Sequence, residues 1–126
     1  MQINFTKMQG CGNDYVYING LTERIPPEAK PDFVRKMSDR HFGIGGDGVI
    51  FVNPSEEADF EMEMYNADGT RAEMCGNGIR CVGKFVYDKG LTDRKEIRVV
   101  SFGKVKYLQL FTEEGKVCLL YTSDAA

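Results

Sequence analysis

One segment of this chain, GNGIRCVGKFVYDK over residues 76–89, constrains the fold more than any other. On a helical wheel of about 100° per residue it shows a single narrow polar stripe, made by Asn77, Arg80, Lys84 and Asp88. The remaining surface is mostly apolar and carries Ile79, Val82, Gly83, Phe85, Val86 and Tyr87. A helix that is apolar over most of its circumference is largely buried, and Gly90 is a common type of residue at a helix end. The sequence therefore predicts a mostly buried helix over 76–89.

The rest of the chain consists mainly of short segments in which apolar and polar residues alternate, a pattern typical of strands. Strands are predicted at 2–8, 14–18, 46–52, 59–66, 96–102, 104–111 and from Lys116 onward, with a hairpin around Gly103. Residues 32–40 predict a short surface helix, and residues 25–31 predict a loop with a possible turn of helix. Together these elements predict an α+β fold, in which a curved mixed or antiparallel sheet wraps around the central helix.

Length and composition set the class of protein. The 126 residues suffice for one domain with a core, and 42% hydrophobic and 28% charged residues are ordinary values for a globular protein. A net charge of −3 without a basic stripe argues against nucleic acid as a partner and favours a small molecule. Because the sequence has no apolar stretch long enough for a membrane span and no secretion signal, we expect a cytoplasmic protein without a membrane partner.

The cysteines do not form a metal site. The four cysteines are Cys11, Cys75, Cys81 and Cys118, and no two of them have the spacing of a CxxC motif. Together with the single His41 they do not match the ligand spacing of a zinc site. In a reducing compartment they are expected to be free thiols. The sequence therefore predicts no bound metal.

Cys75 stands at the start of the buried helix, between the polar turn NADGT at 66–70 and a Gly-Asn-Gly step. Unpaired backbone N–H groups and the helix dipole favour negative charge at such a place, which stabilises a thiolate. The N–H groups of Gly76 and Asn77 are also suited to hold a carboxylate. A thiolate base beside a carboxylate cradle fits removal of the α-proton of an amino acid, as in racemisation or epimerisation.

Four segments resemble one known family. MCGNGIRC (74–81), the preceding NADGT (66–70), FTKMQGCGNDYV (5–16) and DRHFGIGGDGVI (39–50) look like segments of the diaminopimelate epimerase family, in the family's order along the chain. The resemblance runs from about Met1 to Val117. It implies a cofactor-independent epimerase that interconverts LL- and meso-diaminopimelate for lysine and peptidoglycan synthesis. It also implies a two-lobed protein that forms a homodimer at full length and uses two cysteines on opposite faces of the substrate.

The resemblance assigns roles to individual residues. Cys75 matches the catalytic cysteine of the first lobe, and Gly76 and Asn77 match backbone donors to the substrate α-carboxylate. Asn13 and Asn66 match polar side chains that bind the substrate. Gly48 stands where some members carry a substrate-contacting glutamine, so it receives no side-chain role.

The sequence departs from the family pattern toward its end. The second lobe and its catalytic cysteine are absent, so residues 1–117 are expected to form an N-terminal lobe that is inactive alone. Residues 118–126, CLLYTSDAA, do not look like the family and resemble the translation of a transposon-derived sequencing adapter. We expect this tail to be non-native.

Simpler interpretations apply to several motifs. GIGGDG at 43–48 matches a dinucleotide-binding pattern, but it precedes a strand and does not lead from a strand into a helix. Asn13 and Asn66 each lie in a turn sequence, so they can serve the turn itself. Arg40 and His41 are expected on the surface at a helix end.

Core packing is the expected role of two further features, the Met-rich segment at 62–65 and Cys81. Cys81 lies about 120° from Cys75 around the helix and cannot share its site. Two other function classes stay open: a related isomerase of the same fold, and a thiol redox module.

Overall fold

The computed structural model describes residues 3–10, 13–41, 43–72, 76–101 and 103–124. In chain order the elements are β1 (Thr6–Gly10), β2 (Asn13–Asn19), a 3₁₀ turn η1 (Pro27–Ala29), α1 (Lys30–Ser38), β3 (Gly48–Pro54), β4 (Phe60–Asn66), β5 (Arg71–Ala72), α2 (Gly76–Asp88), β6 (Glu96–Ser101), β7 (Lys104–Glu113) and β8 (Lys116–Asp124).

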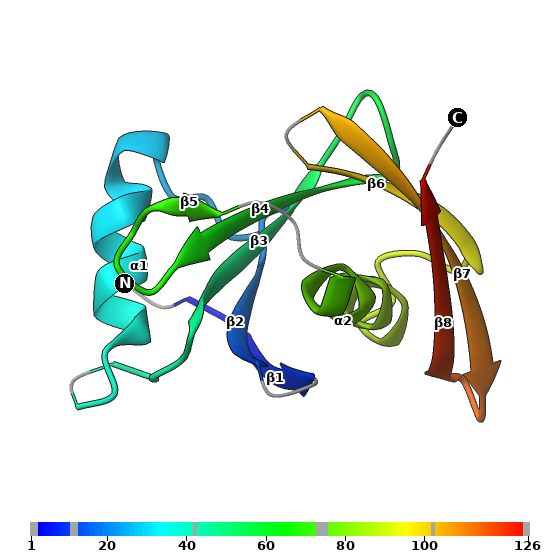
Figure 1. Cartoon of the computed structure of the whole chain (residues 1–126), viewed down its shortest axis with the longest axis horizontal. Helices are drawn as coiled ribbons and strands as arrows, with labels where there is room; N and C mark the ends of the chain where they lie inside the picture. Colours follow the sequence, from blue (N-terminus) through cyan, green and yellow to red (C-terminus); the bar gives the residue numbers. More distant parts are fainter. Residues whose placement is uncertain (1–2, 11–12, 42, 73–75, 102, 125–126) are drawn as a thin grey trace.

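The described strands form one strongly curved sheet in the order β1-β2-β3-β4-β6-β7-β8, with β5 paired to β4 beside this path. Neighbours are antiparallel except for β2–β3 and β4–β6, which are parallel. The sheet curls around α2, and α1 packs outside it against β3 and β4 (Figure 1). This arrangement confirms the predicted α+β fold with a curved mixed sheet around a central helix.

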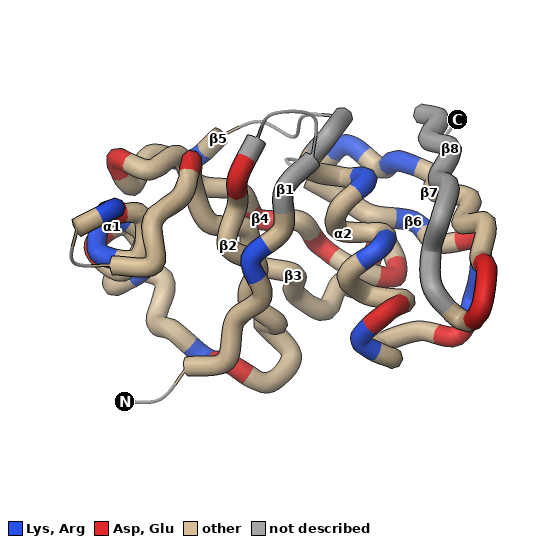
Figure 2. The backbone as a smooth tube through the Cα atoms, turned by 90° about the horizontal axis from the view of Figure 1, so that it is seen from below, with Lys and Arg blue, Asp and Glu red and all other residues tan. Residues whose placement is uncertain are grey.

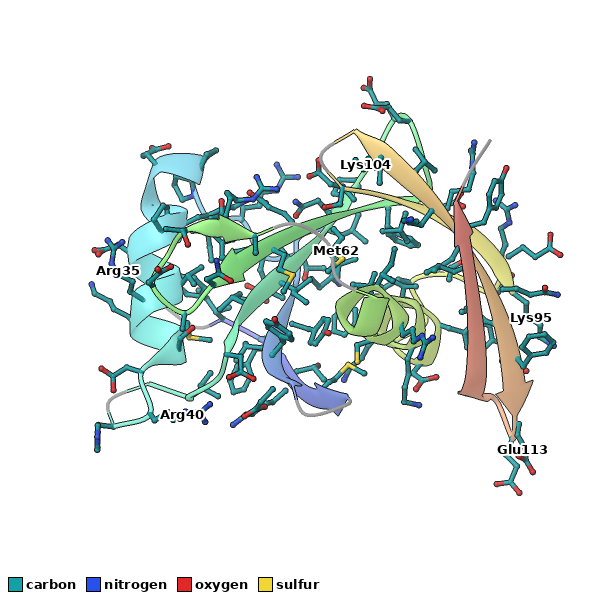
Figure 3. All side chains as sticks on the ribbon, viewed as in Figure 1. Arg35, Arg40, Met62, Lys95, Lys104 and Glu113 are labelled. Atoms are coloured by element: carbon teal, nitrogen blue, oxygen red, sulfur yellow. The ribbon has the colours of Figure 1, made fainter. Side chains whose placement is uncertain are left out.

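Each face of the sheet has its own apolar core, as the alternation of the strands predicts. Toward α2, Ile50, Val52, Met62 and their neighbours pack against the apolar side of the helix. Met62 lies between the sheet and α2 (Figure 3), which confirms a core role for the Met-rich segment. Toward α1, the second core consists of Val16, Ile18, Val34, Val49, Phe51 and Tyr65.

The central helix α2 behaves as its sequence predicts. Arg80 is exposed, and Lys84 Nζ contacts Asp88 Oδ2 at 2.7 Å one turn further along the polar stripe. The helix ends at Asp88, one residue before the predicted end, and Gly90 follows in the left-handed region with a φ of 75°. The N–H of Gly90 donates to the carbonyl of Tyr87 at 3.0 Å, which satisfies a carbonyl at the helix terminus.

A charged cluster lies on the α1 side of the sheet around Glu63, whose side chain is 12% exposed. Oε1 of Glu63 accepts hydrogen bonds from Lys30 Nζ at 2.6 Å and Asn53 Nδ2 at 2.9 Å. Oε2 accepts one from the Tyr65 hydroxyl at 2.8 Å and lies 3.7 Å from Arg71 Nη1. The carboxylate is therefore fully surrounded by donors, as a buried charge requires.

These contacts shift two pKa values. Burial raises the pKa of Glu63, but the hydrogen bonds from Lys30, Asn53 and Tyr65 outweigh it and hold that pKa below its ordinary value. For Tyr65, burial and the adjacent Glu63 carboxylate raise the pKa to about 12.

Some boundaries differ from the predictions. The first strand runs over Thr6–Gly10 and not over 2–8, and the short helix over Lys30–Ser38 and not over 32–40. The two-residue strand β5 was not predicted, because two residues are too few to show alternation. The predicted hairpin around Gly103 is confirmed as β6–β7. Among the described residues, no helix is long and apolar enough to cross a bilayer.

Candidate active site

Three residues from the segments that resemble the family come together at one edge of the sheet, where strands begin or end. β2 begins at Asn13, β3 begins at Gly48, and β4 ends at Asn66. Gly48 pairs with Asn66 across β3–β4, and it pairs with Tyr15 of β2, two residues beyond Asn13. Because neighbouring strands lie about 4.8 Å apart, the backbones at Asn13 and Asn66 are on the order of 10 Å from each other. Asn13, Gly48 and Asn66 are called the edge positions below.

The edge positions also share one face of the sheet. Every second residue of a strand faces the same side, and Tyr15 and Tyr17 of β2 pack in the α2 core. Ile50 of β3 and Met64 of β4 pack in the same core, each two residues from its edge position. By this parity all three edge positions belong to the α2 side of the sheet.

The start of α2 comes to the same end of the sheet. β5 pairs with Met64 and Tyr65, immediately before the end of β4, and its last residue is Ala72. Four residue steps of extended chain span at most about 14 Å, so Gly76 at the start of α2 lies within that distance of Ala72. The predicted catalytic residue Cys75 lies in 73–75, outside the described residues. Gly76 and Asn77 are described as the first turn of α2, and the side chains of Asn13 and Asn77 lie outside the description.

Asn66 is built into the turn between β4 and β5. Its backbone N–H donates to the Thr70 carbonyl at 2.8 Å, and its carbonyl accepts from the Gly69 N–H at 2.9 Å. Its Nδ2 donates to Thr70 Oγ1 at 3.0 Å, and that hydroxyl donates to Asp68 Oδ1 at 2.6 Å. Thr70 hydrogen bonds hold the pKa of Asp68 below its ordinary value. The turn role predicted for Asn66 is therefore present.

This turn leaves one atom of the exposed Asn66 carboxamide for a ligand. Nδ2 is engaged by Thr70, whereas Oδ1 accepts no hydrogen bond from the described residues. An amide oxygen is an acceptor, so the group presented at this edge suits a donor such as an ammonium.

Gly48 has a packing requirement of its own. A Cβ built on Gly48 would lie 2.1 Å from the Tyr65 carbonyl oxygen, well inside van der Waals contact. Glycine therefore allows β3 and β4 to approach closely beside Asn66, and a side chain here would push the two strands apart.

The glycine motif at 43–48 ends helix α1. The N–H groups of Gly43, Gly45 and Gly46 donate to carbonyls of Asp39, Met37 and Ser38 at 2.9, 2.9 and 3.3 Å. The motif leads from α1 into β3, so it precedes a strand as predicted and does not lead from a strand into a helix, as a dinucleotide-binding motif does. Arg40 and His41 are exposed after the end of α1, as predicted.

Cys81 is half-buried and packs against the α2 core, as predicted, and it is a free thiol. Within the described ranges, no group of three His, Cys, Asp or Glu side chains is placed to hold a metal. A pocket of about 430 Å³ lies near the other end of α2, where Phe85, Lys89 and Leu91 help to line it. The described residues that line it do not include Gly48 or Asn66.

The family model for diaminopimelate epimerase matches residues 5–125. The chain belongs to the diaminopimelate epimerase family. It is 57% identical over 115 residues to a diaminopimelate epimerase of Agathobacter rectalis, covering 91% of this chain and 40% of that protein. It is 51% identical over 118 residues to one of Acetivibrio thermocellus, covering 94% of this chain and 41% of that protein. The chain thus spans about 40% of the length of these relatives.

Solved structures show the same fold. A methylitaconate-delta-isomerase matches with a TM-score of 0.77 and 17% identity, over 93% of this chain and 36% of the other. At that identity the match shows the fold alone, which agrees with the predicted curved sheet around a central helix.

The sequence gives no role to Asp14 and Asp47, which are hydrogen-bonded to each other where β2 and β3 begin. In the sequence, Asp47 is only one residue of the glycine motif at 43–48. A carboxylate that accepts a backbone N–H from a distant strand leaves no spacing pattern in the sequence, so only the pairing of β2 with β3 reveals it.

Proposed function

We propose that this chain forms the first half of a cofactor-independent active site that epimerises diaminopimelate at the α-carbon. The observation that carries the proposal is the meeting of the edge positions and the start of α2 at one end and one face of the sheet. Membership of the diaminopimelate epimerase family supports the substrate. In this proposal residues 1–117 are an N-terminal lobe, residues 118–126 are non-native, and the second lobe belongs to a longer protein, called the full-length protein below.

Each residue has a stated part in the reaction. The Cys75 thiolate takes the α-proton and becomes a thiol, and the electron pair left on the α-carbon delocalises into the carboxylate. The N–H groups of Gly76 and Asn77, at the positive end of the α2 dipole, stabilise the negative charge that develops on the carboxylate oxygens. A second thiol, supplied by the other lobe, delivers a proton to the opposite face. The electrons stay in the substrate, so no redox partner is needed.

The two asparagines bind the substrate from the sheet. Asn66 presents Oδ1 to a donor, because Thr70 already engages its Nδ2. Asn13 lies on the same face across two strand spacings, a separation that suits two polar groups of one elongated amino acid. We further propose that the full-length protein is a cytoplasmic homodimer of lysine and peptidoglycan biosynthesis, with no nucleic-acid or membrane partner.

The test follows α-proton exchange of LL-diaminopimelate in deuterated water by NMR. We expect the full-length protein to exchange the proton and form the meso isomer, and Cys75→Ala to abolish both. The matched control is Cys81→Ala, which removes the thiol within α2 and should lower the thermal midpoint while exchange continues. Retained exchange in Cys75→Ala would exclude the assigned base.

The present chain provides a second arm of the test. We expect residues 1–126 alone to form no meso isomer, because inversion needs a proton donor on each face of the α-carbon. Turnover by this chain comparable to that of the full-length protein would contradict the half-site. A full-length protein without exchange would favour a related isomerase or a thiol redox module.

A further inference from the structure

Asp47 makes a pair of hydrogen bonds with the backbone of Asp14 where β2 and β3 begin. The N–H of Asp47 donates to the Asp14 carbonyl at 2.6 Å. In return, Asp47 Oδ2 accepts the Asp14 N–H at 2.8 Å. Since the β2–β3 ladder starts only at the next residue pair, Asp47 acts as the missing strand partner of Asp14. We call this pair of bonds the Asp47 clamp.

A third contact extends the clamp to β4. The carbonyl of Asp47 accepts the N–H of Ala67 at 3.1 Å. Each partner adjoins an edge position: Asp14 follows the one on β2, Ala67 follows the one on β4, and Asp47 itself precedes Gly48. Asp47 therefore connects the three strand ends at which the edge positions lie.

We propose that Asp47 is a positioning residue, whose carboxylate fixes the spacing of Asn13 and Asn66 for substrate binding. The proposal rests on the proposed function for the role of the two asparagines. Of the three contacts, only the one through Oδ2 depends on the side chain, so substitution of Asp47 removes one bond and leaves the backbone able to make the others.

Two cationic side chains beside Asp14 and Asp47 allow the two carboxylates to lie close together. Arg40 bridges them, with Nη2 at 3.5 Å from Asp47 Oδ1 and Nη1 at 3.7 Å from Asp14 Oδ2. Lys7 Nζ lies 3.2 Å from Asp14 Oδ2. The two cations offset the repulsion between the carboxylates, and Asp47 Oδ2 accepts the Asp14 N–H at 2.8 Å between them.

The chain contains a matched control for this clamp. The N–H of Asp59 donates to the Arg98 carbonyl at 3.0 Å, and Asp59 Oδ2 accepts the Arg98 N–H at 2.7 Å. Arg94 Nη1 lies 3.3 Å from Asp59 Oδ1, in the way that Arg40 faces Asp47. We call this pair of bonds the Asp59 clamp. It stands before β4, about 23 Å of extended chain from Asn66.

Steady-state kinetics of the full-length protein test the proposal. Asp47→Ala should raise KM for diaminopimelate about tenfold and change kcat less than about threefold, because misplaced asparagines weaken binding of substrate and transition state alike. Asp47→Asn should keep KM within about threefold of wild type, since its amide oxygen still accepts the Asp14 N–H. Asp59→Ala should leave KM unchanged.

Simple destabilisation gives a different result, because it lowers the active fraction and hence kcat without changing KM. An unchanged KM in Asp47→Ala, or an equal rise of KM in Asp59→Ala, would overturn the proposal.

NMR of the ¹⁵N-labelled 126-residue chain separates this proposal from the proposed function. Asp47→Ala should shift the backbone amides of Asn13 and Asn66 and speed hydrogen exchange at Asp14, whereas Asp59→Ala should leave all three unchanged. If the full-length protein shows no epimerase activity, the proposed function fails and these shifts still decide the positioning role. Unmoved Asn13 and Asn66 amides in Asp47→Ala would refute it.

Discussion

The Asp47 and Asp59 clamps are two copies of one local arrangement at opposite ends of the sheet. Each aspartate directly precedes a strand, donates its N–H to a carbonyl and accepts the N–H of the same partner residue through Oδ2. Each starts a parallel pairing, β2–β3 at one end and β4–β6 at the other. An arginine faces each carboxylate, and Arg40 of the first clamp stands below α1 in Figure 3.

The two clamps differ in their surroundings. Asp47 directly precedes the edge position Gly48. Its carbonyl accepts the N–H of Ala67, the residue after Asn66. Asp59 joins β4 to Arg98 of β6, and no predicted site residue adjoins it among the described residues. In Figure 2, Lys and Arg residues are interspersed with Asp and Glu residues along the described chain. The two clamps thus have similar hydrogen bonds and similar charged neighbours. Only the Asp47 clamp lies beside the proposed site, and this difference in position is what gives it a part there.

The largest expected effect on the free energy of unfolding comes from replacing Glu63, a carboxylate in the middle of β4 that belongs to neither clamp. Glu63→Ala should lower the free energy of unfolding by about 3 kcal/mol, because it leaves the buried Lys30 ammonium without its partner. Chemical denaturation at neutral pH measures this. Glu56→Ala, at an exposed position in the loop before β4, should change the free energy of unfolding by less than about 0.5 kcal/mol.

The sign of the pH dependence follows from the lowered pKa of Glu63. A carboxyl with a lowered folded-state pKa stabilises the fold above its unfolded pKa, here near 4.5, and loses that contribution as the pH falls through the folded value. The stability difference between wild type and Glu63→Ala should therefore be full above pH 4.5 and shrink below it. A difference that is independent of pH would contradict the ionised cluster.

An intermediate effect is expected at the site end of the β3–β4 pair. Gly48→Ala should lower the free energy of unfolding by about 2 kcal/mol and shift the Asn66 amide, because its Cβ would overlap the Tyr65 carbonyl. Gly90→Ala is the control: its φ of 75° is strained for alanine, but no atom lies within 4 Å of the added Cβ. A Gly48→Ala protein with wild-type stability and an unmoved Asn66 amide would show that the strands need no close approach.

The smallest effects should come from the clamps themselves. Asp47→Ala and Asp59→Ala should each lower the free energy of unfolding by about 1 kcal/mol, since each loses one hydrogen bond at the sheet end. The double variant should show the sum within about 0.5 kcal/mol, because the two sites share no partner. Urea denaturation measures all three. Strong non-additivity would mean that the two ends of the sheet are coupled, and the comparison between them would fail.

Much of the fold was predictable because it depends on local patterns. The helix at 76–89 followed from its single polar stripe and from Gly90, and the hairpin at Gly103 followed from two alternating runs on either side of a glycine. The family was predictable from four segments that contain the proposed site residues. For the site, the sequence indicated Asn66 and gave Gly48 no side-chain role. It did not show that the Thr70 hydroxyl engages Asn66 or that Gly48 faces a carbonyl.

The sequence by itself determined which residues are apolar on which side of each element, since periodicity reports the burial of a face directly. Tertiary structure alone decided that β2 pairs with β3 and β4 with β6, in parallel, across intervening helices. The β2–β3 pairing, together with β3–β4, brings Asn13 and Asn66 to one edge. The two parallel pairings leave the Asp14 and Arg98 backbone groups in need of partners. Asp47 and Asp59 supply them because hydrogen-bonding groups at the end of a ladder must be satisfied by whatever the fold brings near, and residues 33 and 39 positions apart carry no sign of it in the sequence.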